Sequence, residues 1–503
     1  MKNIKIIILS VLTPLFLVSC EDFLNNVPRN QWPVEEAMKT YDKAKQSVNG
    51  IYGRFMTGDN ANQDYYVRLT TRSGLIQVTG LMDFSETQAN SPISLWTTAY
   101  YAINAANLAI NGIPGVPDSA FPTTTAKNEL LGEARFLRGY FNSLLLLNYS
   151  CWWDTDDSKF GIVYRDVTSD VSNVNMPRIT VGESWTKVME DIDFAIANMP
   201  NTFVNAKKVS KTFAKAWKAK LLLIRGTMRN TAKDLTDAKT LIDDAIATLP
   251  AAIKMESDMN QTFLKAWDSQ EHIFVRYVED VSNRTSLSGY WSTYGFSYTA
   301  FTAYLNASGQ PTLQSDAVCG VRYGLDWIRT DPRWFVHTGK SRAAETWDTS
   351  ERWVWKKIYR LGSYGGANAT PKDEKYAVYH MRLPELYIMQ AELTARTGGS
   401  NAQAIAPINL MRSKRTVPAL AQLAVPATKE ELLDIIFKEY INELILENGT
   451  EFYASFRFEK EGKTYMEVMK AGSFVFDKTK LQWPIPNTEM VNNPLIEQNP
   501  GQK

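Results

Sequence analysis

The sequence predicts a mostly α-helical protein that carries long loops in the middle of its chain. Apolar residues recur at helical spacing through most of residues 35–250 and 379–448. Capping residues and prolines mark the ends of several of these periodic segments. Between residues 251 and 378 the periodicity is lost and Gly, Ser, Thr and aromatic residues prevail. We expect long loops there, and loops of that length in a compact domain are usually functional.

The composition excludes several classes of protein. Of the 503 residues, 44% are hydrophobic and 22% are charged, as in ordinary globular proteins and unlike disordered chains. The 55 Lys and Arg residues balance 54 Asp and Glu residues, so no basic field exists to attract a nucleic acid. The three cysteines and three histidines have none of the spacings of zinc sites. We therefore expect no metal and no cofactor.

Residues 1–19 have the features of a lipoprotein signal peptide. Lys2 and Lys5 precede an apolar run over residues 6–18, which is shorter than the about 20 residues of a membrane-spanning helix. The run ends in Leu17-Val-Ser-Cys20, which resembles the bacterial lipobox, where the cysteine thiol receives a lipid. Cleavage before Cys20 leaves a protein held to a membrane by acyl chains. The alternative is a plain secretory signal with an incidental cysteine.

The first half of the mature chain is predicted to form a series of helices. Residues 35–55 and 94–113 give the first two. The third is marked by residues that alternate four and three positions apart and so share one helical face. They are Leu130, Ala134, Leu137, Phe141, Leu144 and Asn148.

Three further helices follow in succession. Thr180 and Glu183 have the spacing of a capping box, and the helix that they open ends at Pro200. The next two apolar stripes cover residues 214–228 and 235–249. Helix pairs of this size, with Trp, Ala and a closing Pro, are similar to tetratricopeptide repeats, which stack into a rigid scaffold.

Three helices are predicted near the end of the chain. They cover residues 379–396, 401–414 and 429–448. Thr428 and Glu431 form a second capping box before the last of them.

Several of these helices carry sequences typical of one known family. The segment Gly132-Glu-Ala-Arg-Phe-Leu-Arg-Gly-Tyr-Phe141 resembles the strongest segment of the SusD/RagB family of outer-membrane nutrient-binding lipoproteins. Further matches follow in order over residues 144–149, 185–200, 214–223, 379–387, 408–412 and 439–444, and end with Trp483-Pro-Ile-Pro486 and Gln498-Asn-Pro-Gly501. The resemblance covers essentially the whole mature chain. One departure is Glu447-Asn-Gly-Thr450, where the family usually has Glu-Gly-x-Arg.

This resemblance implies a SusD-like fold in which residues 20–503 form one domain. Tetratricopeptide-like helix pairs, from residues 35–250 and 379–448, would lie on one side, and long ligand-binding loops, from residues 251–378, would lie opposite. Proteins of this family cap a TonB-dependent SusC-type transporter in the outer membrane and pass it oligosaccharides. RagB-like members pass peptides instead.

The resemblance also implies a function without covalent chemistry, so no catalytic residue is expected. Glu21 and Asp22 resemble the acidic patch that, in Bacteroidetes-type lipoproteins, is associated with export to the outer surface of the cell. The expected function is capture of oligosaccharides at the cell surface for import. The first alternative is a RagB-like peptide-binding lipoprotein. A less favoured one is a lipid-anchored glycosidase, which needs two carboxylates across a sugar cleft.

The main candidate for the ligand site is the aromatic segment over residues 289–298. A sugar site needs flat apolar faces, against which sugar rings stack, together with hydrogen-bonding groups at the edges. Tyr290, Trp291 and Tyr294 offer such faces on a loop of small residues. The alternative is a hydrophobic plug that holds this loop onto the scaffold.

A second candidate region covers residues 68–95, where the family's N-terminal ligand loop falls. Arg72 and Phe84 are its candidate ligand-binding residues. Arg72 is suited to bidentate contacts with hydroxyl groups or an acidic sugar, although a solvated arginine is the favoured alternative. Trp96 begins a periodic helix and is expected in the core.

Two other segments contain tryptophans that could belong to a site or to the core. Trp353 and Trp355 alternate as on one face of a strand, and a place in the core and a place on the ligand face are equally favoured. Trp152 and Trp153 precede the aspartates of residues 154–157, a pattern that is superficially like a calcium loop. The spacing of an EF-hand is absent, so a solvated acidic turn is favoured.

Overall fold

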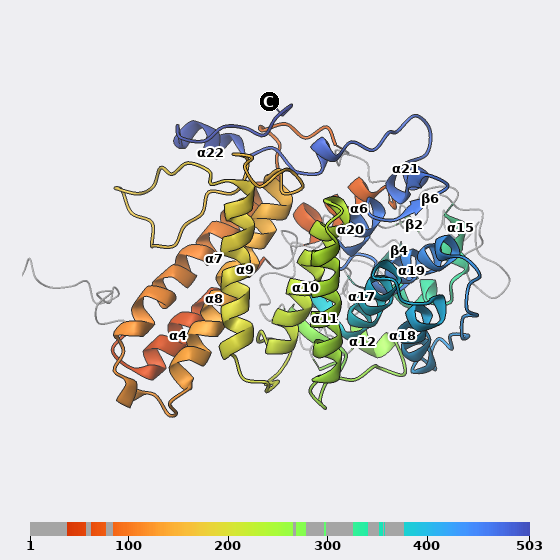
Figure 1. Cartoon of the computed structure of the whole chain (residues 1–503), viewed down its shortest axis with the longest axis horizontal. Coiled ribbons are helices and arrows are strands. Elements are labelled where there is room, and N and C mark those ends of the chain that lie inside the picture. Colours follow the sequence, from red (N-terminus) through yellow and green to blue (C-terminus); the bar gives the residue numbers. More distant parts are fainter. Residues whose placement is uncertain are drawn as a thin grey trace, which may run out of the picture.

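Helices make up most of the protein. The computed structural model describes residues 38–56, 62–76, 84–264, 268–277, 296–297, 325–340, 352–355, 357 and 377–502 (Figure 1). The longer helices are α4 (Tyr41–Tyr52), α7 (Ile93–Gly112), α8 (Ala126–Tyr149), α9 (Val181–Asn198), α10 (Lys211–Met228), α11 (Ala232–Ala247), α17 (Leu383–Arg396), α18 (Asn401–Ser413) and α19 (Lys429–Leu444). The predicted fold class is confirmed.

Shorter elements join and flank these helices. The short helices include η2 (Asn62–Val67), α6 (Arg68–Ser73), α12 (Asn260–Leu264), α15 (Asp326–Thr330), α16 (Trp334–His337), α20 (Thr450–Ser455), α21 (Tyr465–Lys470), η8 (Lys478–Lys480) and α22 (Asn487–Asn492). The strands are β1 (His272–Tyr277), β2 (Phe296–Ser297), β3 (Thr338–Lys340), β4 (Arg352–Trp355), β5 (Ala377–Arg382), β6 (Glu459–Lys460) and β7 (Lys463–Thr464). Ile273, Val275 and Tyr277 alternate in the sequence as in a strand, and they lie in β1.

The long helices stand side by side in an array. Successive pairs are in contact: α7 with α8, α8 with α9, α10 with α11, and α17 with both α18 and α19. Helix α11 also contacts α17, so the two halves of the array are joined although more than a hundred residues separate them in sequence. A single large cluster of buried apolar side chains runs through the array and includes Trp185, Trp217 and Trp483.

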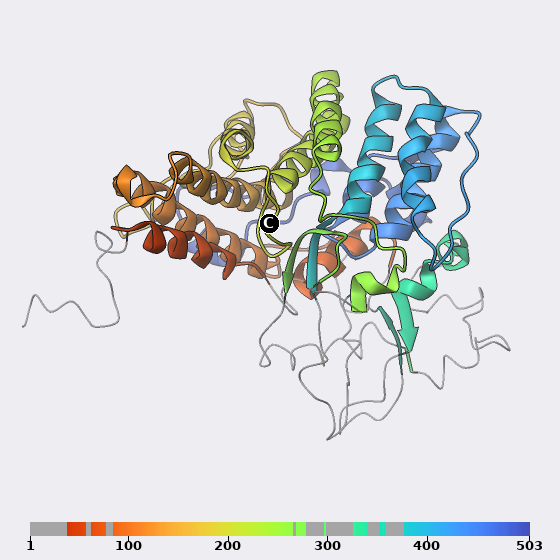
Figure 2. The same ribbon diagram turned by 90° about the horizontal axis from the view of Figure 1, so that it is seen from below.

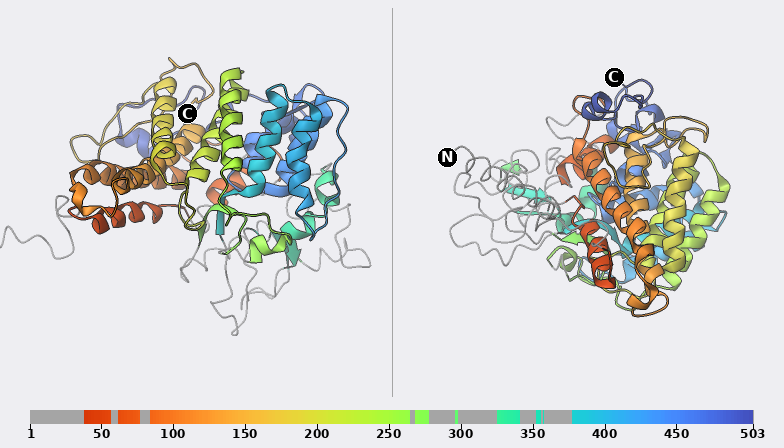
Figure 3. Two further views of the ribbon diagram at one scale, coloured as in Figure 1. Left: turned by 60° about the horizontal axis from the view of Figure 1, so that its bottom comes forward. Right: turned by 90° about the vertical axis from the view of Figure 1, so that its left-hand side faces the viewer.

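Strands β1 to β5 lie on one side of the array (Figure 2), and β6 and β7 form a separate pair beside α19 and α21. β1 pairs antiparallel with β5, and β2, β4 and β3 form a three-stranded sheet in that order. Helices α9 and α11 lie on the opposite side of the molecule from these strands (Figures 2 and 3).

Both predicted capping boxes are present. The Glu183 amide donates to the Thr180 hydroxyl at 3.1 Å, and the Thr180 amide donates to the Glu183 carboxylate at 2.9 Å. Thr428 and Glu431 exchange the same two bonds before α19. These contacts satisfy amides that the first helical turn leaves without partners. The starts of both helices are therefore encoded locally.

Some predicted helix boundaries are wrong. The first helix, predicted from residue 35, begins at Tyr41, where the Thr40 hydroxyl caps it. Residues 379–382, predicted as the start of a helix, form part of β5. Pro384 lies in the first turn of α17, where its missing N–H is not needed, and the residues before it pair with β1. The helix predicted to reach residue 448 ends at Leu444, because positive φ angles at Leu446 and Asn448 turn the chain away.

The most characteristic sequence segment explains the close contact between α8 and α9. A Cβ atom added to Gly139 would lie 3.0 Å from the Asp191 Cβ and 3.2 Å from Ile192 on α9. From the same part of α8, Arg135 and Arg138 both bind the buried Asp191 carboxylate, at 2.8 and 2.7 Å. Glycine therefore allows the approach that brings these ion pairs together.

We predict that Gly139→Val destabilises the protein by about 1 to 3 kcal/mol or more, because the added methyl groups overlap α9. The control is Gly50→Ala in α4, where no atom lies within 4 Å of the added Cβ. That substitution should stabilise by about 0.5 to 1 kcal/mol through helix propensity. Thermal and urea unfolding would measure both effects, and equal stabilities of the two variants would contradict the packing argument.

Candidate ligand-binding face

The predicted site residues divide into two groups. Tyr290, Trp291 and Tyr294 lie outside the described residues, as does Cys20. Arg72 and Phe84 lie within them. That these residues contact a ligand stays a prediction, and the structure defines what surrounds them.

The aromatic segment with Tyr290 and Trp291 is bounded by strands. It follows β1, which ends at Tyr277, and it includes Phe296 and Ser297 of β2, which pair with β4. Trp355 of β4 is buried, and its ring meets that of Trp334 edge to face at 5.3 Å. Of the two places considered for Trp355, the core is therefore the observed one.

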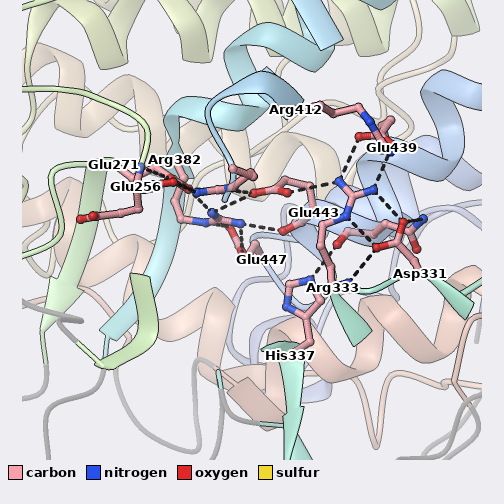
Figure 4. Close-up of polar contacts among 12 residues, drawn as sticks. Glu256, Glu271, Asp331, Arg333, His337, Arg382, Arg412, Glu439, Glu443 and Glu447 are labelled. Carbon is pink, nitrogen blue, oxygen red and sulfur yellow. Dashed lines mark hydrogen bonds and ion pairs between the residues drawn. The ribbon is translucent and has the colours of Figure 1, made fainter. Parts of the chain in front are cut away.

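A cluster of buried charges lies where these strands meet the helices (Figure 4). We call it the buried ion network. Its cations are Arg333, Lys357, Arg382, Arg412 and Arg415, and its anions are Glu271, Asp331, Glu439, Glu443 and Glu447. Within the described residues, the two signs are thus equal in number.

Glu443 of α19 is the centre of the network. Its carboxylate accepts hydrogen bonds from Arg415, from Arg333 at 3.3 Å and from Arg382 at 3.4 Å, and it is completely buried. Burial acts to raise the pKa of this carboxyl. The three guanidinium groups outweigh burial and hold its pKa well below the usual range. Glu443 is therefore charged at every physiological pH.

Arg382, at the end of β5, links the strands to the turn after α19. It donates two hydrogen bonds to the Glu447 carboxylate, at 2.8 and 2.7 Å, and one to Glu271 at 2.5 Å. Glu271 stands directly before β1 and also accepts two bonds from Arg415, at 2.6 and 2.9 Å. The paired strands β1 and β5 are thus held at one end by charge-assisted bonds, the strong class of protein hydrogen bond.

Arg333 makes the corresponding link for the three-stranded sheet. It precedes α16 and β3, and it donates two bonds of 2.9 Å to Glu439 of α19. Lys357, just after β4, donates to the Ile445 carbonyl at 2.7 Å and pairs with Glu447 at 2.5 Å. Burial lowers the pKa of this lysine to about 8 despite the opposing Glu447 charge. Both sheets that border the predicted loops are therefore anchored to α19 or to the turn behind it.

Arg72 is buried, and its guanidinium is hydrogen-bonded to the protein's own backbone. Its guanidinium donates to the carbonyls of Lys480, Leu481 and Gln482, the last two at 3.1 and 3.5 Å. The favoured expectation of a solvated arginine is wrong, because the C-terminal segment covers it. Arg72 lies under a cavity of about 400 Å³ whose lining includes Phe84, Glu86 and Gln502.

Phe84 is half-buried beside this cavity. Its ring stacks on that of Phe474 at 5.8 Å, and the Arg72 guanidinium lies 4.5 Å from its centre. The Lys470 ammonium lies 4.9 Å from it. Cations over an aromatic face gain electrostatic attraction, so both help to fix the ring. Arg72 is thus placed to orient Phe84 and the cavity floor.

The remaining sequence-based candidates have structural roles. Trp96 is buried in α7, as expected. Trp152 is buried, and Asp156 in the acidic turn pairs with Arg229 at 2.6 Å. Among the described residues, no group of three or more His, Cys, Asp or Glu side chains is arranged to hold a metal ion. In the same part of the chain, no helix is both long and apolar enough to cross a membrane.

The first prediction for this face concerns Arg382. Replacing it by Gln leaves Glu447 and Glu271 as buried charges with too few partners, so Arg382→Gln should cost about 3 to 5 kcal/mol of unfolding free energy. The control is Lys159→Gln in an ion pair whose side chains are 63% and 65% exposed, where about 0 to 1 kcal/mol is expected. Urea unfolding would compare them, and equal costs would show that the network is not holding the strands.

The second prediction concerns Glu451, which ties α20 to α6 by accepting a hydrogen bond from Thr70. Burial raises the pKa of this carboxyl to about 7, and one of its oxygens has no hydrogen-bond partner among the described residues. A glutamate in an unfolded chain has a pKa of about 4.3. The raised pKa of Glu451 therefore stabilises the folded protein at low pH, and this stabilisation is lost as the pH rises through about 7.

Glu451→Gln removes this titration. Relative to the original protein, the variant should therefore gain stability between pH 5 and pH 8, by about 1 to 3 kcal/mol. Unfolding curves measured across that range at constant ionic strength would test this. A stability difference that does not change with pH would contradict it.

Comparisons with known proteins agree with the fold. A family model described as "Starch-binding associating with outer membrane" matches residues 22–223, and the model of the SusD family matches residues 330–501. SusD-like protein P2 of Formosa agariphila is 23% identical, with 100% of both chains aligned.

Solved structures share the fold at lower identity. A putative sugar-binding protein from Bacteroides vulgatus is 19% identical, with a TM-score of 0.65 over 93% of this chain and 100% of the other. A laminarin-binding SusD-like protein is 18% identical, with a TM-score of 0.67 over 92% of this chain and 100% of the other. Together the two family models cover both ends of the helical array and every member of the buried ion network except Glu271, and the chain belongs to the SusD family.

Proposed function

We propose that this protein is a cell-surface lipoprotein that captures oligosaccharides and delivers them to a TonB-dependent SusC-type transporter. The lipid on Cys20 would hold it at the outer membrane, facing the exterior. Binding, and not covalent chemistry, would be its activity.

The observation that carries the proposal is the frame of anchored strands that flanks the predicted loops in the sequence. Strands β1 and β2 bracket the segment with Tyr290, Trp291 and Tyr294, and the buried ion network fixes β1, β3 and β5 to the helices. Aromatic platforms on loops bind sugars well when a scaffold limits the conformational entropy lost on binding. A frame of this kind meets that requirement.

The relatives support oligosaccharides as the ligand class. One matching family model is described as starch-binding, and one solved neighbour binds laminarin. Both polymers are neutral glucans, whose rings present apolar faces for stacking. The neutral balance of the chain, 55 basic against 54 acidic residues, suits a neutral ligand better than a polyanion.

The test is calorimetric titration of the protein with maltoheptaose, laminarihexaose and a panel of short peptides. We expect saturable binding of a glucan without product formation. Trp291→Ala and Tyr294→Ala should each weaken it by about tenfold or more, as for a central aromatic contact. The control is Leu410→Ala, an exposed apolar residue on α18, which should leave the affinity unchanged.

Each other outcome identifies an alternative. Binding of peptides alone would assign the protein to the RagB-like, peptide-capturing type. Release of smaller sugars from the glucan would indicate a glycosidase. Glucan affinity that is unchanged in both aromatic variants would move the site away from residues 289–298.

A further inference from the structure

A second cavity lies apart from the strands that border the predicted loops. Its volume is about 320 Å³, at the lower end of the about 300 to 1,000 Å³ typical of small-molecule sites. It is enclosed by α7, by the loop that follows α8, and by α22, in the upper left of Figure 1. None of its lining residues belongs to the described strands.

One wall of this cavity is aromatic. Trp96, Tyr100 and Tyr101 follow one another along α7, and the rings of the first two lie 4.9 Å apart. The Tyr100 hydroxyl donates to the Val163 carbonyl at 3.0 Å, so this ring is fixed. Tyr101 is 60% exposed, an unusual degree for a large aromatic side chain, and it stands at the mouth.

Asparagines on α7 hold the opposite wall in place. Asn104 accepts a hydrogen bond of 2.7 Å from the Ser169 amide. Asn107 donates two bonds of 3.0 Å to the carbonyls of Arg165 and Val167. Arg138 on α8 donates to Asn107 at 3.0 Å and also binds Asp191 of α9. The irregular loop is therefore fixed to three long helices, and the cavity is preformed.

The rim carries hydrogen-bonding groups that the described part of the protein leaves unused. The side chains of Thr97, Thr488 and Asn492 make no hydrogen bond there, and the Ser169 hydroxyl makes none either. Glu489 uses one carboxylate oxygen to accept from Asn493 at 3.1 Å. Its other oxygen is left for a ligand. A carboxylate and neutral donors around an aromatic wall match the hydroxyl groups and the apolar face of a sugar ring.

The charges at the cavity favour a neutral ligand. Arg165 is the cation among the lining residues, and its guanidinium donates to the Asn173 carbonyl at 2.9 Å, to the Val174 carbonyl and to the Met176 sulfur at 3.6 Å. Its hydrogen bonds therefore stabilise the loop and do not point to a ligand in the cavity. Glu489 keeps an available negative charge, which disfavours uronic acids and other acidic sugars.

We propose that this cavity, which we call the α7–α22 cavity, is a second carbohydrate site that takes a short stretch of a neutral oligosaccharide. It goes beyond the loop site of the proposed function and uses different residues. Tyr101 supplies the stacking face, and Glu489 accepts hydroxyl hydrogen bonds. Two separated sites on one protein raise the effective concentration of a polymer at either one.

The experiment is carboxylate footprinting. Carbodiimide with glycine ethyl ester modifies accessible carboxylates, and mass spectrometry reads the rate at Glu489 and, as a reference, at Asp237 on α11, which is half-buried like Glu489 and does not line the cavity. With maltoheptaose or laminarihexaose at about twice the dissociation constant, mass action predicts an about threefold slower reaction at Glu489. Asp237 should be unaffected. An acidic oligogalacturonide should give no protection.

Tyr101→Ala should abolish the protection of Glu489, whereas Val204→Ala, at an exposed residue that does not line this cavity, should leave it unchanged. Calorimetric glucan binding without protection of Glu489 would overturn the second site and leave the proposed function standing. Protection that disappears in Trp291→Ala would also overturn it. If Glu489 is protected and the glucan affinity is unchanged in Trp291→Ala and Tyr294→Ala, the loop site is overturned instead.

Discussion

Glu443 is the residue on which the arrangement of helices and strands depends. An isolated carboxylate buried in a protein costs several kcal/mol, and so does each guanidinium beside it. Here Glu443 faces Arg333, Arg382 and Arg415, and each of these has a second carboxylate. Because most of these charges share two or more partners, displacing one member leaves its neighbours with fewer partners of opposite charge. The network therefore favours one relative position of α19, β1 and β5.

The long helices are specified by local sequence signals. Caps such as Thr180 with Glu183, and apolar spacing such as that of Leu130, Ala134 and Leu137, act over a few residues. Local signals of this kind can be recognised in a sequence, and they predicted the long helices. The exceptions were boundaries decided by tertiary partners. Residues 379–382 have the composition of a helix start, but β1 pairs with them.

The buried ion network was not predicted, for a physical reason. Arg382 and Glu271 are 111 positions apart, and a charged residue in a sequence is normally solvated. The one local sign was the placement of single charges inside apolar stretches, such as Arg382 between Met381 and Leu383. Arg72 shows the same limit, because a solvated side chain was the favoured expectation and the structure shows it bound to carbonyls 408 to 410 positions later. A charged residue that becomes buried needs a partner, and the fold decides which residue supplies it.

Polar side chains hold the described segments next to both candidate sites in place. Asparagines of α7 fix one wall of the α7–α22 cavity, and the ion network fixes the strands that lead into the aromatic segment. Irregular backbone can present side chains at angles that a helix cannot, but it loses affinity if it must become ordered on binding. Polar side chains on the helices, such as Asn107, reduce that cost for the loop beside the α7–α22 cavity and leave Tyr101 exposed. Under the proposed function, ligand specificity would change through residues such as Trp291, while Glu443 and Asn107 would keep the scaffold unchanged.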